Sequence, residues 1–285
     1  MQKLIFVTII WAFSFSLIGE FLSGKVDSYF AAFVRILLAF FVLLPFLRKT
    51  SFKLAFQISL IGAFQIGLMY IFYYNSFAYL TVSEVAIFTI FTPFYVTLFY
   101  DIMDKKFRPL YLISAFLAIF GAYVIKIGEI SNDFIIGFLL IQMANIFFAL
   151  GQSGYKIIIK NNPQISQFNH FGYFFLGALV VSFIAFMIFG NFEKISPDLT
   201  QISILIWLGV VASGFGYYFW NKGASEVDSG VLAIMNNAVI PLAIVINFLF
   251  WHKDIEIVKF LIGSFFMVFA LVLHKYFIKY YERKS

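Results

Sequence analysis

The chain has 285 residues, of which 62% are hydrophobic and 12% are charged, and its mean hydropathy is +0.95. A soluble domain is about half apolar and about a quarter charged, because its surface must meet water. This composition predicts a membrane protein. The net charge of +6 gathers at the ends of apolar runs, so we expect no nucleic-acid partner. The lack of cysteine excludes disulfides, thiolate metal sites and cysteine nucleophiles.

Apolar runs of about 20 residues follow one another along the chain, each long enough to cross a bilayer as a helix. Their continuity favours helices over the alternating strands of a membrane barrel. The first run would also suit a signal peptide, but no small-residue cleavage site follows it. We predict ten spans, at 4–22, 28–47, 55–79, 83–101, 109–127, 134–156, 168–190, 201–221, 229–251 and 257–278.

Lysine and arginine are distributed unevenly between alternate loops of these spans. With the N-terminus inside the cell, 14 of the 20 fall on the cytoplasmic side, five fall on the opposite side, and Arg35 lies within a span. Cytoplasmic loops carry an excess of positive charge. We therefore expect a multi-pass protein of the bacterial cytoplasmic (inner) membrane with both termini in the cytoplasm, where 280–285 forms a short basic tail.

Features of the first half of the chain recur in the second half at an offset of 146 to 149 residues. Pro93 and Pro241 each lie near the middle of a span, and Asn75 and Asn221 each precede a short connection into the next span. Apolar segments resemble one another by composition alone, so the argument depends on the order of these matches. That order indicates a repeat of about half the chain.

A repeat of five spans has a direct consequence for topology. Because five is odd, the second half must enter the membrane from the side opposite the first. The sequence therefore predicts an all-α membrane protein of ten helices in two inverted five-helix repeats, at 1–128 and 134–279. Such repeats suit alternating access, because exchanging the conformations of the halves turns an inward-open cavity outward.

Several short motifs occur in a fixed order along the chain. They are Trp11 to Phe15, Phe33 to Ala39, the prolines at 93 and 241, and Asp254 followed by a last span with Gly263. In this order they resemble the drug/metabolite transporter superfamily, specifically its EamA-type domains, over nearly the whole chain. The resemblance implies a ten-helix fold and transport of small metabolites, commonly export of amino acids or related compounds.

Arg35 is the one formal charge well inside a predicted span. A charge at this depth costs roughly 2.5–3.5 kcal/mol on insertion scales, so something must offset it. We predict that Arg35 holds a substrate carboxylate or gates the outer side of a cavity. The alternative is a structural arginine that pairs with Glu20, Glu84 or freed backbone carbonyls, or that snorkels outward. Glu20 and Glu84 are also candidates for proton coupling, although a uniporter or a potential-driven exporter fits as well.

Side-chain amides within the spans form a second group of candidates. Gln142, Asn145 and Gln152 share one helix face. The alternative role for amides is hydrogen bonding between helices, worth under about 2 kcal/mol each. The amides that we predict to line a polar central cavity are Asn75, Gln142, Asn145, Gln152, Asn221, Asn236 and Asn237.

Aromatic residues and prolines complete the predicted site. Tyrosine and tryptophan also gather at membrane–water interfaces, and this is the stronger expectation for the cluster around Tyr70, Tyr73 and Tyr217. Each mid-span proline frees a helix carbonyl, so Pro93 and Pro241 are hinge candidates, unless they only reflect the frequency of proline in membrane helices. The aromatic cavity candidates are Trp11, Tyr74 and Tyr218.

These patterns favour a transporter over an enzyme. No hydrolase motif and no metal-ligand spacing occurs at a span centre, and we expect no cofactor. We predict an alternating-access exporter of amino acids, amines or related small solutes. The alternatives are a flippase for lipids or lipid precursors and a non-transporting scaffold or receptor. The expected partners are a small-molecule substrate and the lipid bilayer; a monomer is the simplest assembly, and the oligomeric state stays open.

Overall fold

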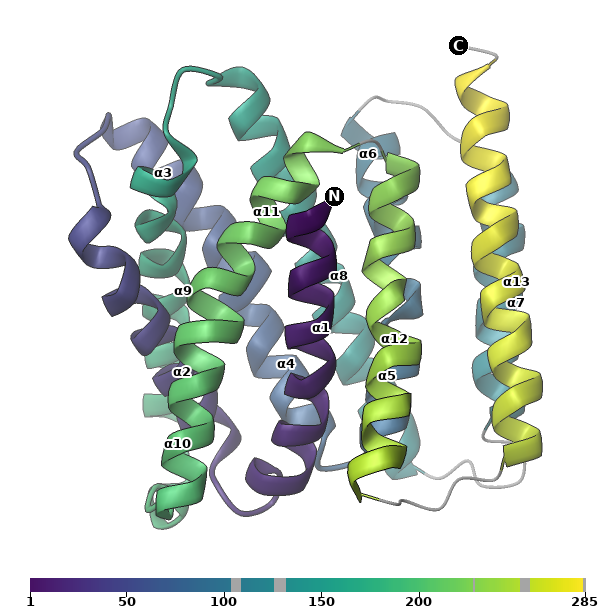
Figure 1. The fold of residues 1–285 in the computed structure, drawn as a ribbon, viewed down its shortest axis with the longest axis horizontal. Helices are drawn as coiled ribbons and strands as arrows, with labels where there is room; N and C mark the ends of the chain where they lie inside the picture. The colour runs from purple at the N-terminus through teal and green to yellow at the C-terminus, as the bar shows by residue number, and fades with distance from the viewer. Residues whose placement is uncertain (104–108, 126–131, 228, 252–256, 284–285) are drawn as a thin grey trace.

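The computed structural model describes residues 1–103, 109–125, 132–227, 229–251 and 257–283, and Asp254 of the motif series lies outside them. Every regular element in these ranges is helical, as the composition predicts (Figure 1). Two shorter apolar helices cover Val82–Val96 and Ala238–Trp251. Seven described helices are long and apolar enough to cross a membrane: Gln2–Leu22, Ser28–Phe46, Phe52–Ser76, Asn132–Asn161, Gln167–Phe189, Leu199–Glu226 and Ile257–Tyr281. The helical, multi-pass prediction is confirmed, and the count of ten spans stays a prediction.

In the first half, π-helical and 3-10 segments interrupt several of the helices. The π-helical segments η1 and η3 continue α1 and α3, and the 3-10 segment η4 separates α5 from α6. The bounds are α1 Gln2–Leu17, η1 Ile18–Leu22, α2 Ser28–Leu43, η2 Leu44–Phe46, α3 Phe52–Gly62, η3 Ala63–Leu68, α4 Met69–Ser76, α5 Val82–Phe88, η4 Thr89–Phe91, α6 Thr92–Met103 and α7 Leu110–Ile125.

The helices of the second half include longer ones than those of the first half. A π-helical segment, η6, again lies between two α-helices, α10 and α11. The bounds are α8 Asn132–Asn161, α9 Gln167–Phe189, η5 Phe192–Lys194, α10 Leu199–Trp207, η6 Leu208–Phe215, α11 Gly216–Glu226, α12 Ser229–Trp251 and α13 Ile257–Glu282. The spans predicted to end at residues 156, 221 and 278 thus continue to Asn161, Glu226 and Glu282, because polar residues prolong a helix beyond its apolar stretch.

Side-chain caps fix where several helices begin. The Asp27 carboxylate accepts a hydrogen bond from the Phe30 amide at 2.7 Å at the start of α2. Thr81 and Glu84 form a reciprocal capping box at the start of α5, and Asp198 and Gln201 form another at the start of α10. Such caps satisfy amides that have no partner within the helix. These caps lie at the ends of the loops that the sequence predicts, so the helices begin there.

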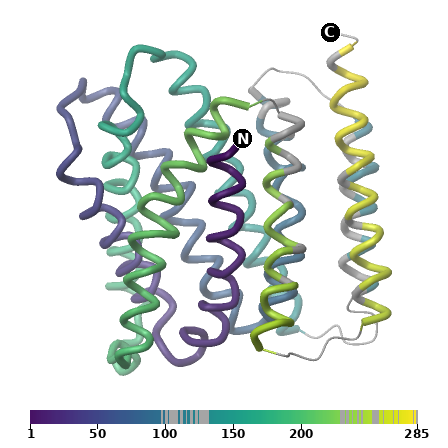
Figure 2. Tube along the Cα trace, viewed as in Figure 1, coloured from purple at the N-terminus to yellow at the C-terminus, as the bar shows by residue number. Residues whose placement is uncertain are grey.

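Helices from the two halves interleave in the bundle. Helix α9 packs against α2 and α3, α8 packs against α4 and α6, and α1 packs against α11 and α12. Close approach of α3 and α9 depends on glycine: a Cβ at Gly62 would lie 1.8 Å from the Phe174 carbonyl oxygen. Helices α7 and α13 pair side by side at one edge of the bundle, as the chain trace shows (Figure 2).

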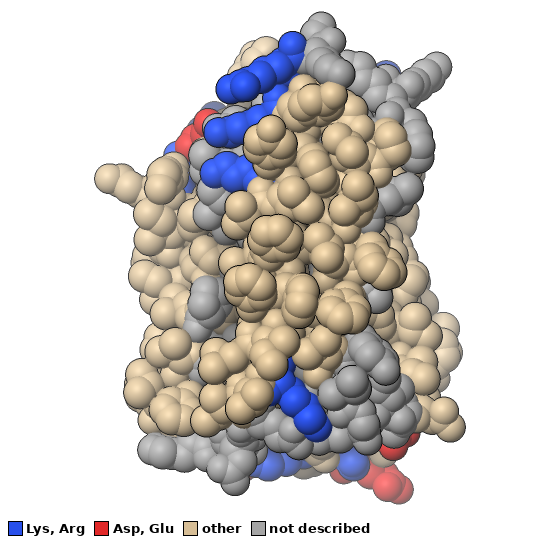
Figure 3. Space-filling model, turned by 90° about the vertical axis from the view of Figure 1, so that its right-hand side faces the viewer, with Lys and Arg blue, Asp and Glu red and all other residues tan. Residues whose placement is uncertain are grey.

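The outer surface of this edge is apolar along its middle. Val258, Leu261, Phe265 and Val272 on α13 are each at least 60% exposed. In the space-filling view of this side, charged residues gather toward the two ends, with an apolar band between them (Figure 3). A band of this kind matches the hydrocarbon layer of a bilayer, and the ends match its headgroup regions.

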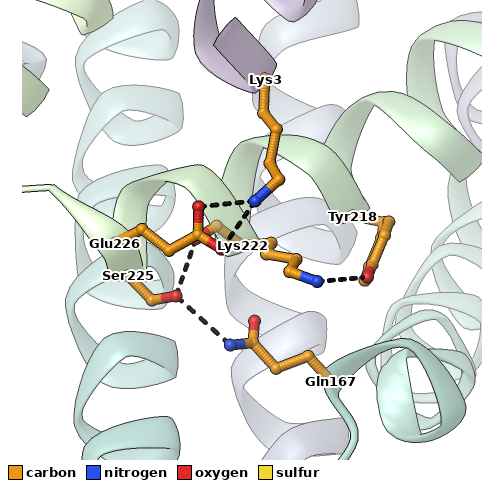
Figure 4. Close-up of polar contacts among 6 residues, drawn as sticks. All are labelled: Lys3, Gln167, Tyr218, Lys222, Ser225 and Glu226. Carbon is orange, nitrogen blue, oxygen red and sulfur yellow. Dashed lines mark hydrogen bonds and ion pairs between the residues drawn. The ribbon is translucent and has the colours of Figure 1, made fainter. Parts of the chain in front are cut away.

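Polar contacts join the halves at both ends of the bundle. At the end near the N-terminus, the Lys3 ammonium lies 2.7 and 2.6 Å from the two carboxylate oxygens of Glu226 on α11 (Figure 4). At the other end, the Asp27 amide donates to the Lys194 carbonyl at 3.0 Å, and the Asn191 amide donates to the Asp27 carboxylate at 3.0 Å. The start of α1 and the end of α13 lie toward the upper side of the view in Figure 1.

Candidate functional site

A cavity lies between helices of both halves, with an empty volume of about 640 Å³ that includes its opening to solvent. Its polar lining residues are Ser14, Arg35, Thr89, Thr92, Asn145 and Asn236. Its aromatic lining residues are Trp11, Phe15, Tyr70, Tyr73, Phe148 and Tyr217. The cavity is therefore mostly apolar with a few polar groups, as small-molecule sites are.

Arg35 on α2 is the charged residue among the described residues of this lining, and only 2% of it is exposed. Its Nε donates to the Ser213 hydroxyl at 2.6 Å, and its Nη1 donates to the Tyr74 hydroxyl at 3.4 Å. The guanidinium carbon lies 4.4 Å from the centre of the Tyr70 ring. The hydroxyls of Tyr70 and Ser213 are 2.8 Å apart. Residues of α2, α4 and η6 thus hold the guanidinium in place.

Within the described part of the chain, the Arg35 charge has no counter-ion. Among the described residues, hydroxyl groups and an aromatic face contact Arg35, and no carboxylate does. The alternative of an ion pair with Glu20 or Glu84 is therefore wrong. A guanidinium has five N–H donors, and the described hydrogen bonds use Nε and Nη1. The Nη2 donors are available to a ligand with a planar anionic group.

The backbone opens where α5 gives way to α6, as the sequence predicts for the turn before Pro93. Thr89–Phe91 form a 3-10 segment there, and the Asn145 amide on α8 donates to the Phe88 carbonyl at 2.9 Å. The Asn145 carbonyl oxygen accepts from the Thr92 hydroxyl at 3.3 Å. Irregular backbone at membrane depth needs such partners. A hinge motion at Pro93 stays a prediction.

Asn236 on α12 differs from Asn145 in its hydrogen bonding. It is 8% exposed and lines the cavity, yet none of the described residues hydrogen-bonds to its side chain. A buried amide without a partner loses the hydrogen bonds that it makes with water. The Asn236 nitrogen is therefore a buried donor without a partner among the described residues, on a side chain that lines the cavity.

Comparison with known proteins identifies the family. The profile of the EamA-like transporter family matches residues 3–127 and 135–275. The chain belongs to the EamA-like transporter family. It is therefore a membrane transporter and not an enzyme, and the resemblance stated from the sequence motifs is confirmed. A solved crystal structure that is 13% identical matches with a TM-score of 0.68 over 96% of this chain and 95% of the other, which shows the fold alone.

Three relatives of this EamA-like transporter are similar over 278 residues, or 96% of the chain. The biotin transporters of Salmonella typhimurium and Escherichia coli K12 are 44% and 45% identical, and the match covers 93% of each relative. A probable biotin transporter of Pseudomonas aeruginosa is 42% identical, and the match covers 97% of it. The relatives are thus named for the transport of a small metabolite.

The cavity brings together four of the residues predicted from the sequence: Trp11, Arg35, Asn145 and Asn236. Tyr74 lies behind Arg35 as a hydrogen-bond partner. Trp11 donates from its indole nitrogen to the Ala212 carbonyl in η6 at 2.9 Å. The wider turns of a π-helix leave such carbonyls for partners outside the helix. The first and second halves therefore meet at this cavity.

The other predicted amides lie outside the cavity lining. Gln142 accepts from the Tyr95 hydroxyl at 3.1 Å, and Gln152 accepts from the Trp220 indole at 2.9 Å. These are contacts between helices, which was the alternative role for the amides. Asn75 and Asn221 donate to carbonyls four residues earlier, at 2.7 and 3.1 Å, and Tyr218 accepts from Lys222 at 3.4 Å (Figure 4). The side chains of Asn237 and Pro241 lie outside the described part of the chain.

The two acidic candidates are not among the cavity-lining residues. Glu84 accepts from the Thr81 amide at 2.8 Å and from its hydroxyl at 3.0 Å, so it caps α5. Glu20 lies in η1 near the end of the first helix. Proton coupling through either residue stays a prediction.

Tyr70, Tyr217 and Ser213 are site residues that the sequence prediction did not include. The interfacial location expected for the tyrosines is wrong, because Tyr70, Tyr73 and Tyr217 are at most 8% exposed. A signal was available: Tyr70 and Tyr217 are separated by 147 residues, which lies within the offset of the predicted repeat. Matching positions in two halves of a carrier meet near the midplane. Ser213 has no signal of its own in the sequence.

Proposed function

We propose that this transporter carries biotin across the bacterial cytoplasmic membrane by alternating access. Biotin has a carboxylate, a four-carbon chain and a bicyclic ring system that contains a thioether and a urea. The names of the three relatives, at 42–45% identity, support this substrate. The proposal replaces the amino acids and amines predicted from the family resemblance. It keeps a small organic acid, which is what the predicted role of Arg35 requires.

The observation that carries the proposal is the state of Arg35. Its guanidinium is buried on the cavity wall, and among the described residues only hydroxyls and aromatic rings contact it. A charge at this depth is costly without a compensating partner. A substrate carboxylate would supply the missing charge and accept charge-assisted hydrogen bonds from Nη2. An anionic substrate is thus favoured over a neutral or cationic one.

Two inverted halves suit alternating access, and we propose that they are 1–128 and 134–279. The glycine pairs 62 and 67 and 209 and 214 are related by the same offset of 147 residues. The π-helical segment η3 begins directly after Gly62, and η6 begins one residue before Gly209. Packing is also equivalent, since η3 lies against α9 while η6 lies against α2. These correspondences support the repeat.

We also propose ten spans, with both termini in the cytoplasm. Seven helices, the two shorter apolar helices and α7 together give that number. The location of both chain ends toward one end of the bundle supports an even number of spans (Figure 1). The excess of lysine and arginine on the same side supports the cytoplasmic assignment. Export, which the family resemblance implies, stays a prediction that transport assays in both directions can test.

The test is transport by the purified protein in liposomes. Radiolabelled biotin should enter saturably and show counterflow against internal unlabelled biotin. Arg35→Ala should weaken biotin binding about 10- to 100-fold, because a hydrogen bond to a charged group is worth about 1.5–3 kcal/mol. Arg48→Ala is the matched control, since Arg48 is exposed beyond the end of α2.

A second ligand separates recognition of the carboxylate from general damage. Biotinol, in which an alcohol replaces the carboxylate, should bind wild type and Arg35→Ala with similar affinity. Absence of saturable biotin flux in wild type would refute the proposed substrate. Equal affinity of wild type and Arg35→Ala for biotin would refute the role of Arg35.

A further inference from the structure

The polar lining of the cavity falls into two groups on different helices. Arg35 on α2 belongs with the hydroxyls of α4 and η6, and these three elements pack together. Thr89, Thr92, Asn145 and Asn236 belong to η4, α6, α8 and α12, which also pack together. Helix α1 contacts both η6 and α12, so it lies between the groups (Figure 1).

The wall between the groups is apolar and aromatic. Trp11 on α1 contacts the rings of Phe148 and Tyr217, with ring centres 6.1 and 4.8 Å apart. Phe15 and Val239 also line the cavity. A ligand that reaches from Arg35 to the second group must therefore have an apolar middle. This pattern fits an elongated molecule with one polar group at each end.

The two amides of the second group are not equivalent. Both ends of the Asn145 amide are occupied, since it donates to the Phe88 carbonyl and accepts from the Thr92 hydroxyl. Neither end of the Asn236 amide is occupied by a described residue, and its nitrogen is fully buried. Asn236 is thus the member of this group with hydrogen bonds to offer. It lies on the helix that packs against η4, where the backbone is already open.

We infer that Asn236 recognises the urea group of the substrate while Arg35 holds its carboxylate. This inference rests on the proposed function. A primary amide offers an N–H donor and a carbonyl acceptor side by side, and a cyclic urea offers the complementary acceptor and donor. One pair of hydrogen bonds would satisfy both groups in a buried site. Asn236 is therefore a specificity-determining residue that selects a neutral urea or cyclic amide at the end opposite the carboxylate.

The test uses two ligands that differ in one group. Biotin is compared with 5-(tetrahydrothiophen-2-yl)pentanoic acid, which has the same carboxylate, chain and sulfur ring and lacks the urea. Calorimetric titration of the purified full-length protein gives the dissociation constant of each. Asn236→Leu should weaken biotin binding about 30-fold, because two neutral hydrogen bonds are lost. Its affinity for the urea-free acid should match that of wild type.

Asn247→Leu is the control for loss of an amide from the same helix. Asn247 is buried on α12, donates to the Ser83 hydroxyl at 3.4 Å and is not in the cavity lining. Its replacement should change the two dissociation constants by the same factor. If Asn236→Leu does not purify as a monodisperse protein, Asn236→Ser removes the amide with a smaller change in polarity and is expected to show the same selective loss.

The outcomes separate the inference from the proposed function. Biotin binding by wild type together with equal effects of Asn236→Leu on both ligands would overturn the inference and leave the function standing. An unchanged affinity of Asn236→Leu for biotin would do the same. Failure of wild type to bind biotin at all would overturn the proposed function and the inference with it. Selective loss of biotin binding supports both.

Discussion

The contact between α3 and α9 yields a prediction whose size follows from the geometry. A Cβ at Gly62 would lie 1.8 Å from the Phe174 carbonyl oxygen, and one at Gly177 would lie 1.8 Å from the Ser59 carbonyl oxygen. Since ordinary contact begins at 3.4 Å, alanine at either position requires the backbones to separate by about 1.6 Å. Neither backbone can move aside as the end of a flexible side chain can. We expect each substitution to cost about 1–3 kcal/mol.

Two other glycines provide a graded series and a control. A Cβ at Gly67 would lie 3.1 Å from Val181 and 3.2 Å from Ala178, so its neighbours need to shift by only a few tenths of an ångström. A Cβ at Gly214 would meet nothing closer than 3.5 Å. Gly214→Ala should be neutral or slightly stabilising, because alanine favours the helix more than glycine does. Gly67→Ala should fall between Gly214→Ala and Gly62→Ala.

Thermal unfolding in detergent, followed by size-exclusion chromatography of the heated protein, measures the series. The expected order of unfolding temperature is Gly214→Ala at or above wild type, then Gly67→Ala, then Gly62→Ala and Gly177→Ala. An unfolding temperature of Gly62→Ala equal to that of wild type would refute the close approach of α3 and α9. Equal losses for Gly62→Ala and Gly214→Ala would refute the argument from contact distance.

Two further predictions concern the site and the topology. Ser213→Ala removes the hydrogen-bond acceptor for Arg35 Nε. It should weaken binding of a carboxylate ligand about fivefold, since one hydrogen bond of about 1 kcal/mol is lost. An equal loss of affinity for the alcohol analogue would contradict a role of Ser213 through Arg35. Because the chain lacks cysteine, single cysteines at Gln2, Glu193 and Lys279 can be labelled with an impermeant maleimide in cells. We expect only Glu193→Cys to react from outside, and opposite accessibility of Gln2→Cys and Lys279→Cys would exclude an even number of spans.

Apolar length predicts where helices lie but not where they end. The runs located α8, α11 and α13, yet each helix continues past its apolar stretch, to Asn161, Glu226 and Glu282. Hydropathy reports the part that meets lipid, whereas the backbone stays helical as long as its hydrogen bonds are satisfied. The 3-10 turn before Pro93 was predictable, because proline lacks an N–H and crowds the preceding turn. The π-helical segments have no such local signal.

The site likewise has residues that the sequence predicts and residues that it does not. Arg35 was predictable because a formal charge at mid-span is costly and must have a reason. Whether Tyr70 and Ser213 lie beside Arg35 depends on how α2, α4 and η6 pack. The sequence pattern of a single helix does not contain this information. Amides pose the same problem: Gln152 contacts Trp220 while Asn236 faces the cavity, and both are simply amides within a span. Which neighbour a side chain contacts is decided only when the helices pack into the bundle.

The lone guanidinium also has an energetic consequence for transport. A carrier whose cavity holds one positive charge moves that charge through the membrane field when it reorients empty, and moves no net charge when a monovalent anion fills it. The field contributes about 2.3 kcal/mol per charge per 100 mV. A negative cell interior therefore draws the empty site inward, so that anions leave downhill and enter uphill. Net uptake of an anion by such a carrier against its electrochemical gradient requires a cation or proton to travel with it, and that companion ion would set the direction of flux.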